Sequence, residues 1–430
     1  MEEIIYKKGR IIGKKNKRGM EFEFEIAIPT HKCDRYALLL EHDGLNDANV
    51  KSMLKLADEG LAPYCVNIGV FPAVQGMSDG EKYNRRINSY DLFNSEYADF
   101  VIFELIPYIE KEYGISFYDD PDMHYVSGGS SGGISAFVIG WFHPEFFRRV
   151  YMSSPSFLAM GRGNEIPYLI RKYETKPLRI YEEYSEFEPD EYFGASYPID
   201  IEAERALKYA GYDYKYEYFS GEGHCSRYKN YDNAYERNKW IWRDYKTNKI
   251  VAPRNSPRID VFLSPESAWE RAETFPEKEV YKPNALDGNV VLSADKQFYY
   301  VSRPTEDVVY AHLVGDPSVE NRSVHALLHT IPCVEPKGGI DIDVDVNDRL
   351  YVLTGGGRNT VREELRTHRR HTRSTRGQAY RDIRHGLNIR QNGSGNIQAC
   401  VKTRILRKQS PYGLRLLRLN YQYEKRPTSL

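Results

Sequence analysis

The stretch from His124 to Ser154 reads HYVSGGSSGGISAFVIGWFHPEFFRRVYMSS. A β-rich run at 123–127 enters the turn Gly-Gly-Ser-Ser-Gly-Gly, and an apolar segment of helical character follows at 134–141. Glycines on both sides of a serine fit a strained turn, in which any Cβ would collide with the neighbouring strand or helix. The stretch therefore predicts a strand, a tight bend that carries a serine, and a helix.

A serine at such a bend is typical of the nucleophile elbow of serine hydrolases. The bend lifts the hydroxyl above the end of the sheet, and the N-terminus of the following helix points at the oxyanion that forms. Gly-x-Ser-x-Gly fits twice here, centred on Ser130 and on Ser131. The alternative is a Gly/Ser loop that binds phosphate or only turns the chain, because the motif alone is a weak signal. Its place between a strand and a helix favours the nucleophile.

A general base is expected after the serine, because the fold places serine, acid and histidine in that order. Of the eleven histidines, three precede the serine and six lie beyond residue 300. His143 stands before Pro144 at a helix end, which is typical of a capping or surface residue. His224 follows the strand-like run 214–219 in a Gly-Glu-Gly-His-Cys-Ser loop. We therefore predict His224 as the base, with a solvated turn histidine as the alternative.

The elbow resembles that of the esterase branch of the α/β-hydrolases, which includes enterochelin esterase, feruloyl esterases and esterase D. In that branch x-Gly-Gly follows the nucleophile, which implies Ser130 as the nucleophile and the backbone N–H of Ser131 as an oxyanion donor. An Asp-Gly-x turn after the third strand supplies a second donor in similar esterases, which implies the backbone N–H of Leu45. An ordinary strand-to-helix turn capped by Asp47 is the equal alternative for that segment.

The acid is expected in the acidic run 182–191, just after the sixth predicted strand. Related esterases carry the acid several residues past this strand, in a D-G-x-x-D-like turn. That pattern implies Glu188, although Tyr184 stands where the first Asp is usual; Asp190 is the second choice and Glu183 the third. The alternative is that these carboxylates are only solvated loop residues. The acid would accept the imidazole N–H, fix its tautomer and stabilise the imidazolium.

Alternating strand and helix patterns predict the doubly wound, mostly parallel sheet of an α/β-hydrolase in residues 1–250, with helices on both faces. Strand-like runs lie at 21–28, 36–41, 64–71, 123–127, 149–153, 178–181 and 214–219. Helical patterns lie at 48–59, 95–113, 166–173 and 201–210. The likeness to the esterase branch covers about residues 21–245. It includes a loop with Arg85 and Arg86, for which a surface salt bridge is favoured over contact with substrate.

Residues 251–357 differ in character and read first as a linker and then as strand–turn–strand units. The units at 288–301 and 341–353 resemble blades of gluconolactonase-type propellers, so an incomplete β-propeller-like segment is expected. Such propellers bind a divalent cation. Alternating acidic residues in the second unit favour a solvated strand face over a metal site: Asp341, Asp343 and Asp345.

Residues 358–430 form an irregular basic tail with 18 Lys+Arg against 4 Asp+Glu, whereas the first 357 residues carry 42 against 57. Fifteen of those 18 basic residues are Arg. One interpretation is a nucleic-acid-binding tail, because Arg neutralises phosphates. We favour a shifted reading frame or a cloning junction, because Lys/Arg usage and strand periodicity change together near Gly357.

Composition narrows the class of protein. At 430 residues and 41% hydrophobic content the chain can bury a proper core. Five scattered cysteines without CxxC spacing argue against a disulfide framework and against zinc, and favour a reducing compartment. The N-terminal run MEEIIYKKGRII lacks the apolar region of a signal peptide, and no run has transmembrane length. These features predict a cytoplasmic enzyme without a membrane partner.

Together these observations predict a serine carboxylic-ester hydrolase that works through an acyl-enzyme, with Ser130, His224 and Glu188 as its triad. This chemistry needs neither cofactor nor metal. The resemblance implies a small-molecule or oligosaccharide ester as substrate: first a feruloyl or acetyl ester of plant cell-wall carbohydrate, and second a siderophore trilactone. The alternative from another class is a metal-dependent lactonase or binding protein that acts through the propeller-like part.

Overall fold

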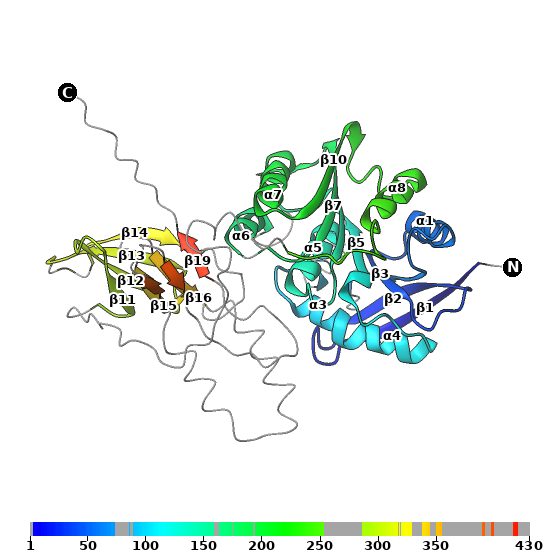
Figure 1. The fold of residues 1–430 in the computed structure, drawn as a ribbon, viewed down its shortest axis with the longest axis horizontal. Helices are drawn as coiled ribbons and strands as arrows, with labels where there is room; N and C mark the ends of the chain where they lie inside the picture. Colours follow the sequence, from blue (N-terminus) through cyan, green and yellow to red (C-terminus); the bar gives the residue numbers. More distant parts are fainter. Residues whose placement is uncertain are drawn as a thin grey trace, which may run out of the picture. The chain divides into compact units, whose positions relative to one another are not determined.

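A computed structural model of the chain is shown in Figure 1. It describes residues 3–73, 86, 89–158, 163–173, 175–191, 194–252, 286–316, 318, 320–328, 338–344, 350–354, 389–391, 397–399 and 416–419. The chain divides into two compact units. The first unit comprises residues 1–171 and 175–253, and the second comprises 172–174 and 254–430.

The first unit is built on an eight-stranded sheet. In their order across the sheet the strands are β1 (Ile4–Ile12), β2 (Glu21–Pro29), β4 (Cys65–Val70), β3 (Ala37–His42), β5 (His124–Gly129), β6 (Arg149–Ser153), β7 (Arg179–Phe187) and β10 (Asp213–Gly223). From β4 to β10 all neighbours pair in parallel, whereas β2 is antiparallel to β1 and to β4. This mostly parallel sheet confirms the predicted α/β-hydrolase fold.

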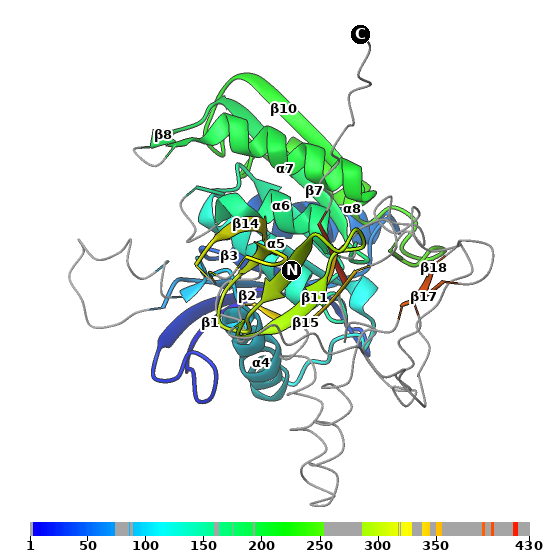
Figure 2. The same cartoon turned by 90° about the vertical axis from the view of Figure 1, so that its left-hand side faces the viewer.

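Helices cover both faces of this sheet. Their bounds are α1 (Asp47–Asp58), α3 (Glu96–Phe100), α4 (Ile106–Tyr113), α5 (Ser131–Phe142), α6 (Ile166–Lys172), α7 (Ser196–Ala210) and α8 (Tyr231–Ile241). Helices α1 and α8 pack together on one side of the sheet, and α5 packs on β5 and β6 from the other side (Figure 1). Helix α7 runs alongside β10 (Figure 2). Single 3₁₀ turns precede β5 and α6, at Pro121–Met123 and Gly163–Glu165.

Residues that alternate along the central strands fill a core on each face of the sheet. Tyr125, Tyr151 and Tyr181 pack with Trp242 in the core that α1 and α8 cover. Their neighbours along the strands are equally buried and must face the opposite side, because successive side chains of a strand alternate: Val126, Val150 and Ile180. Burial on both faces explains why these strands read as near-continuous apolar runs.

Three elements differ from the predicted bounds. The edge strand β1 was not predicted, because its apolar residues lie in two short groups at its ends, separated by Lys-Lys-Gly-Arg, and most of its residues are exposed. Strand β7 continues to Phe187, well past the predicted end at 181, so the acidic residues expected in a loop lie partly within a strand. The helix predicted at 95–113 consists of α3, a π-helical segment at Val101–Leu105, and α4.

A short hairpin follows β7 in the first unit and is formed by β8 (Asp190–Glu191) and β9 (Gly194–Ala195). The hairpin begins at Asp190, three residues after Phe187, in the segment where a loop was expected. Asp190 therefore lies in a strand of this hairpin.

The second unit contains antiparallel strands. One sheet has four strands, β11 (Asn289–Leu292), β12 (Phe298–Ser302), β13 (Val308–Leu313) and β14 (Arg322–Leu327). A second sheet joins β15 (Gly339–Val344), β16 (Leu350–Thr354) and β19 (Leu416–Leu419), and β17 (Ile389–Gln391) pairs with β18 (Ile397–Ala399). The two predicted strand pairs correspond to β11–β12 and β15–β16. Asp345 and most of the tail 358–430 lie outside the described residues, and the propeller stays a prediction.

Candidate active site

Ser130 lies at the bend between β5 and α5, with φ 54° and ψ −125°. This left-handed backbone is rare for a residue with a side chain, and the Ser130 N–H donates to the Ser153 carbonyl at 2.8 Å. The flanking glycines permit close packing. A Cβ on Gly128 would lie 2.2 Å from the Gly132 carbonyl carbon, and one on Gly132 would lie 2.7 Å from the His42 Cβ. The strained, glycine-flanked turn expected here is present.

The parallel pairing of β7 with β10 places the predicted acid beside the predicted base. Phe187 pairs with Gly223, so the next residue of each strand, Glu188 and His224, leaves the sheet at the same place. The Nδ1 atom of His224 is hydrogen-bonded to Oε2 of Glu188. The Glu188 side chain is only 3% exposed, and the His224 side chain is 34% exposed. A carboxylate behind the ring leaves Nε2 as the nitrogen that can exchange a proton with a hydroxyl.

The other two candidate acids lie elsewhere. Asp190 is exposed. Glu183 is buried, with Oε1 accepting from the Arg237 guanidinium at 3.3 Å and Oε2 accepting from the Tyr151 hydroxyl at 2.6 Å. The loop placement predicted for Glu183 was wrong, because these buried partners keep it inside β7. Only Glu188 of the three contacts His224.

The loop that carries the base packs against the elbow. A Cβ on Gly129 would lie 3.1 Å from the Cys225 Sγ. The Cys225 N–H donates to Ser154 Oγ at 3.1 Å, and Asn46 Nδ2 donates to the Tyr228 carbonyl at 2.8 Å. These contacts tie the loop after β10 to the elbow, to the loop after β6 and to the start of α1. The nucleophile's loop and the base's loop are therefore neighbours.

The hydroxyl of Ser130 has a partner that the sequence did not indicate. Its Oγ is hydrogen-bonded to Oγ of Ser156 at 2.8 Å. No hydrogen bond joins Ser130 to His224, both of which the structure describes. Ser156 lies in a loop of small polar residues, where a hydroxyl shows no periodicity or spacing that would set it apart.

The two predicted oxyanion donors lie at neighbouring strand ends. Ser131 is the first residue of α5, where backbone amides have no partner within the helix. Leu45 follows β3, which pairs in parallel with β5, so both segments lie at one edge of the sheet. The Leu45 N–H donates to Glu25 Oε2 at 3.3 Å. Its role as an oxyanion donor stays a prediction.

A clamp formed by Asp43, Arg86 and Tyr90 holds the turn after β3. Asp43 has φ 65°, and its Oδ1 lies 2.6 Å from the Arg86 guanidinium and accepts from the Tyr90 hydroxyl at 2.5 Å. Arg86 thus forms a salt bridge, the role favoured for it, whereas Arg85 lies outside the described residues. The clamp fixes the backbone from which the Leu45 N–H projects.

Two further histidines, His42 and His143, are buried, and their pKa values are shifted in opposite directions. His42 is buried, its Nδ1 lies 2.9 Å from the Ser127 carbonyl, and burial lowers its pKa to about 4. His143 was expected to be a capping or surface residue, and this was wrong. It is buried, with Nε2 2.9 Å from Asp99 and Nδ1 2.8 Å from Glu145. Although burial opposes the shift, these hydrogen bonds raise the pKa of His143 to about 10.

The surroundings of His224 favour its protonated form. Hydrogen bonds to Cys225 and to Glu188 raise the pKa of His224 to about 10. The protonated ring is therefore favoured over the neutral ring at this position. Loss of that proton is required before Nε2 can act as a base.

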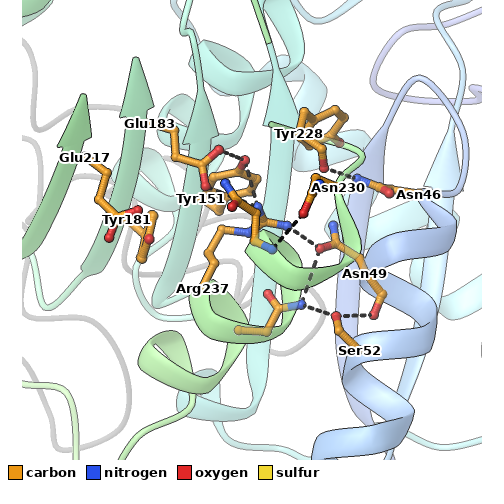
Figure 3. A network of polar contacts seen from close by, with 12 residues as sticks. Asn46, Asn49, Ser52, Tyr151, Tyr181, Glu183, Glu217, Tyr228, Asn230 and Arg237 are labelled. Carbon is orange, nitrogen blue, oxygen red and sulfur yellow. Dashed lines mark hydrogen bonds and ion pairs between the residues drawn. The ribbon is translucent and has the colours of Figure 1, made fainter. Parts of the chain in front are cut away.

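A buried polar network is centred on Arg237 (Figure 3). Arg237 of α8 is fully buried and donates to Asn49 Oδ1 at 2.6 Å, to the Tyr151 hydroxyl at 3.0 Å and to Glu183 Oε1 at 3.3 Å. Its partners belong to α1, β6 and β7. The network thus joins β7 and β6, from which the acid and the Ser156 loop emerge, to α8, which follows the base's loop.

Replacing Arg237 with alanine should destabilise the first unit by about 3–5 kcal/mol, because the Glu183 carboxylate would be left buried without its cation. Urea unfolding, followed by circular dichroism, measures the change. Arg10→Ala is the control, because Arg10 forms an exposed ion pair with Glu23, which contributes at most about 1 kcal/mol. A loss below about 1 kcal/mol for Arg237→Ala would contradict the expected role of this network.

Comparison with known proteins gives one family. The model of the family described as "Putative esterase" matches residues 18–269. A search of curated proteins found no match. Among solved structures, a ferulic acid esterase is 18% identical with a TM-score of 0.43, covering 56% of this chain and 97% of its own. A siderophore hydrolase from Aspergillus nidulans is 15% identical with a TM-score of 0.43, covering 57% and 97%. Ferric enterobactin esterase from Salmonella typhimurium is 17% identical with a TM-score of 0.42, covering 56% and 58%.

In the part of the chain that the structure describes, no three His, Cys, Asp or Glu side chains cluster as metal ligands would. None of its helices has an apolar stretch that could cross a bilayer.

Proposed function

The chain belongs to this esterase family and is a carboxylic-ester hydrolase, and we propose that it works through an acyl-enzyme formed on Ser130. One observation carries the proposal: a buried carboxylate, Glu188, is bonded to His224 at the sheet edge where Ser130 stands on a strained bend. A serine, a histidine and a carboxylate in this arrangement are the groups that nucleophilic acyl transfer requires.

The proposed reaction has two stages. Ser130 Oγ attacks the ester carbonyl carbon while Nε2 of His224 takes the hydroxyl proton, and the N–H groups of Ser131 and Leu45 hold the oxyanion. The alcohol leaves with the proton from His224, and an acyl-enzyme is left. Water then attacks the acyl carbonyl with His224 again as base. Glu188 orients the imidazole and stabilises its charged form in both stages.

We propose acyl esters of plant cell-wall carbohydrate, feruloyl or acetyl, as the substrates, with siderophore trilactones as the second candidate. Exposed aromatic side chains on β7, α7 and β10 support a substrate that carries a ring, because aromatic faces stack on phenolic and sugar rings. Phe187 directly precedes Glu188, and the rings of Tyr197 and Tyr218 lie 5.9 Å apart; all three side chains are exposed.

The test combines a substrate panel with active-site labelling. We expect the full chain to hydrolyse methyl ferulate or acetylated xylan faster than a catecholate trilactone, and without added metal. A fluorophosphonate should label the peptide that contains Ser130, as read by mass spectrometry. Faster hydrolysis of the trilactone would make siderophore esters, and not cell-wall esters, the proposed substrates. Metal-dependent lactone hydrolysis without labelling would contradict the serine mechanism.

A further inference from the structure

The loop after β6 is bonded directly to the nucleophile. Ser156 Oγ lies 2.8 Å from Ser130 Oγ, and the Ser156 N–H donates to the Ser130 carbonyl at 3.2 Å. In the other direction, the Ser130 N–H donates to the Ser153 carbonyl at 2.8 Å. These two backbone hydrogen bonds fix the positions of Ser130 and Ser156 relative to each other, so that their hydroxyls lie within hydrogen-bond distance.

The same loop is anchored to the acid's strand and to the base's loop. The Ser154 N–H donates to the Glu183 carbonyl at 2.7 Å, and Ser154 Oγ accepts from the Cys225 N–H at 3.1 Å. Ser154 has φ 45°, a strained conformation for a residue with a side chain. The loop therefore bonds both to the nucleophile's bend and to the base's loop, which places the Ser156 hydroxyl beside Ser130 Oγ.

We propose that Ser156 is a further catalytic residue, whose hydroxyl donates a hydrogen bond to Ser130 Oγ and assists breakdown of the acyl-enzyme. The inference rests on the proposed function of Ser130 as nucleophile. The direction of the bond follows from the reaction: the proton of Ser130 is transferred to His224, so Ser156 must be the donor when the serines remain bonded.

Acyl-enzyme breakdown is the stage at which this bond strengthens. Water attacks the acyl carbonyl carbon and gives a proton to Nε2 of His224. The bond between that carbon and Ser130 Oγ then breaks, Oγ keeps the bonding pair, and His224 returns the proton to it. Ser156 keeps its own proton throughout. The products are a carboxylic acid and the free serine.

The effect on the two stages differs because the acceptor changes. In the acyl-enzyme, Oγ is an ester oxygen and a weak acceptor, whereas the departing Oγ carries negative charge and accepts strongly. A bond that is stronger in the transition state than in the ground state accelerates that step. During acylation Oγ changes from a good acceptor to a poor one, so the bond gives no such advantage.

The test measures the two stages separately, with p-nitrophenyl acetate as substrate. For Ser156→Ala we expect deacylation, followed as decay of the acetyl-enzyme by intact mass spectrometry, to slow by about 2- to 10-fold, the contribution of one hydrogen bond. Both kcat and KM should fall together, while kcat/KM, which reports acylation, should stay within about 2-fold. Ser156→Thr, which keeps a hydroxyl, should restore deacylation.

Two controls separate this role from a structural one. Ser95→Ala removes a half-buried hydroxyl that is bonded to Asp99 at 3.1 Å, and it should change neither stage. If Ser156→Ala folds poorly, Ser156→Cys, with a weaker donor of similar size, should still slow deacylation selectively.

Three outcomes would overturn the inference. Unchanged deacylation in Ser156→Ala would show that the hydroxyl has no catalytic role. Equal losses in kcat and kcat/KM would show that Ser156 only positions Ser130. An acetyl group found on a residue other than Ser130 would instead refute the proposed function, and the inference with it.

Discussion

Replacing Ser130 with alanine is expected to lower kcat for p-nitrophenyl acetate by about 10⁴-fold or more, because no acyl-enzyme can form. Ser131→Ala should change kcat by less than about 10-fold, since it keeps the backbone N–H that is proposed to hold the oxyanion. Initial rates and fluorophosphonate labelling measure both variants. Ser131 is a matched control, because it is the next residue of the same Gly-Gly-Ser-Ser-Gly-Gly turn.

The reverse pattern, with activity retained in Ser130→Ala and lost in Ser131→Ala, would assign the nucleophile to the other serine. The environment of Ser131 argues against that assignment. Its hydroxyl is hydrogen-bonded to Asp91, a buried carboxyl whose pKa burial raises to about 6. Ser131 is the first residue of α5, and its hydroxyl is occupied by the hydrogen bond to a buried acid. Ser130, in contrast, lies on the strained bend.

Glu188→Gln is expected to lower kcat by on the order of 10³- to 10⁴-fold, because an amide cannot stabilise the imidazolium or fix its tautomer. Asp190→Asn is the matched control, since Asp190 lies two residues further along, is exposed, and should be replaceable with little effect. Steady-state rates at one pH compare the two variants. A greater loss in Asp190→Asn than in Glu188→Gln would make Asp190 the acid.

The pH dependence of the same variants tests the pair further. The pKa of His224 is raised from 6.5 to about 10, so the protonated pair contributes stability fully below pH 6.5 and loses that contribution as pH rises through about 10. Activity should rise over the same window, because the base must be neutral. In Glu188→Gln the rising limb of kcat/KM should move to lower pH. If the rising limb of the kcat/KM profile did not move in Glu188→Gln, Glu188 would not be a cause of the raised pKa of His224.

Local rules were sufficient for the elbow and for the central strands of the sheet. The bend at Ser130 is specified by its own glycines, and the central strands are apolar because both of their faces are buried. The family resemblance supplied Glu188, and the register of β7 with β10 shows why that residue meets His224. These features depend on neighbours in sequence or on one strand pairing.

Other features depend on distant partners and could not be predicted. Strand β7 was ended too early because Glu182 and Glu183 look like loop residues. In the structure Glu182 accepts from the Tyr214 hydroxyl at 2.7 Å, and Glu183 is bonded to Arg237. The contact of Ser156 with the nucleophile was not predicted for the same reason, since its partner, Ser130, lies in another loop.

The dependence of Glu183 on Arg237 has a consequence for biosynthesis. Chains emerge from the ribosome N-terminus first, so the bend at Ser130 is made well before helix α8 (Tyr231–Ile241). Until Arg237 docks, the Glu183 carboxylate of β7 has no cation to compensate its charge, so burial of this strand is unfavourable. A nascent chain is therefore not expected to form a working hydrolase until helix α8 has been synthesised and Arg237 has docked.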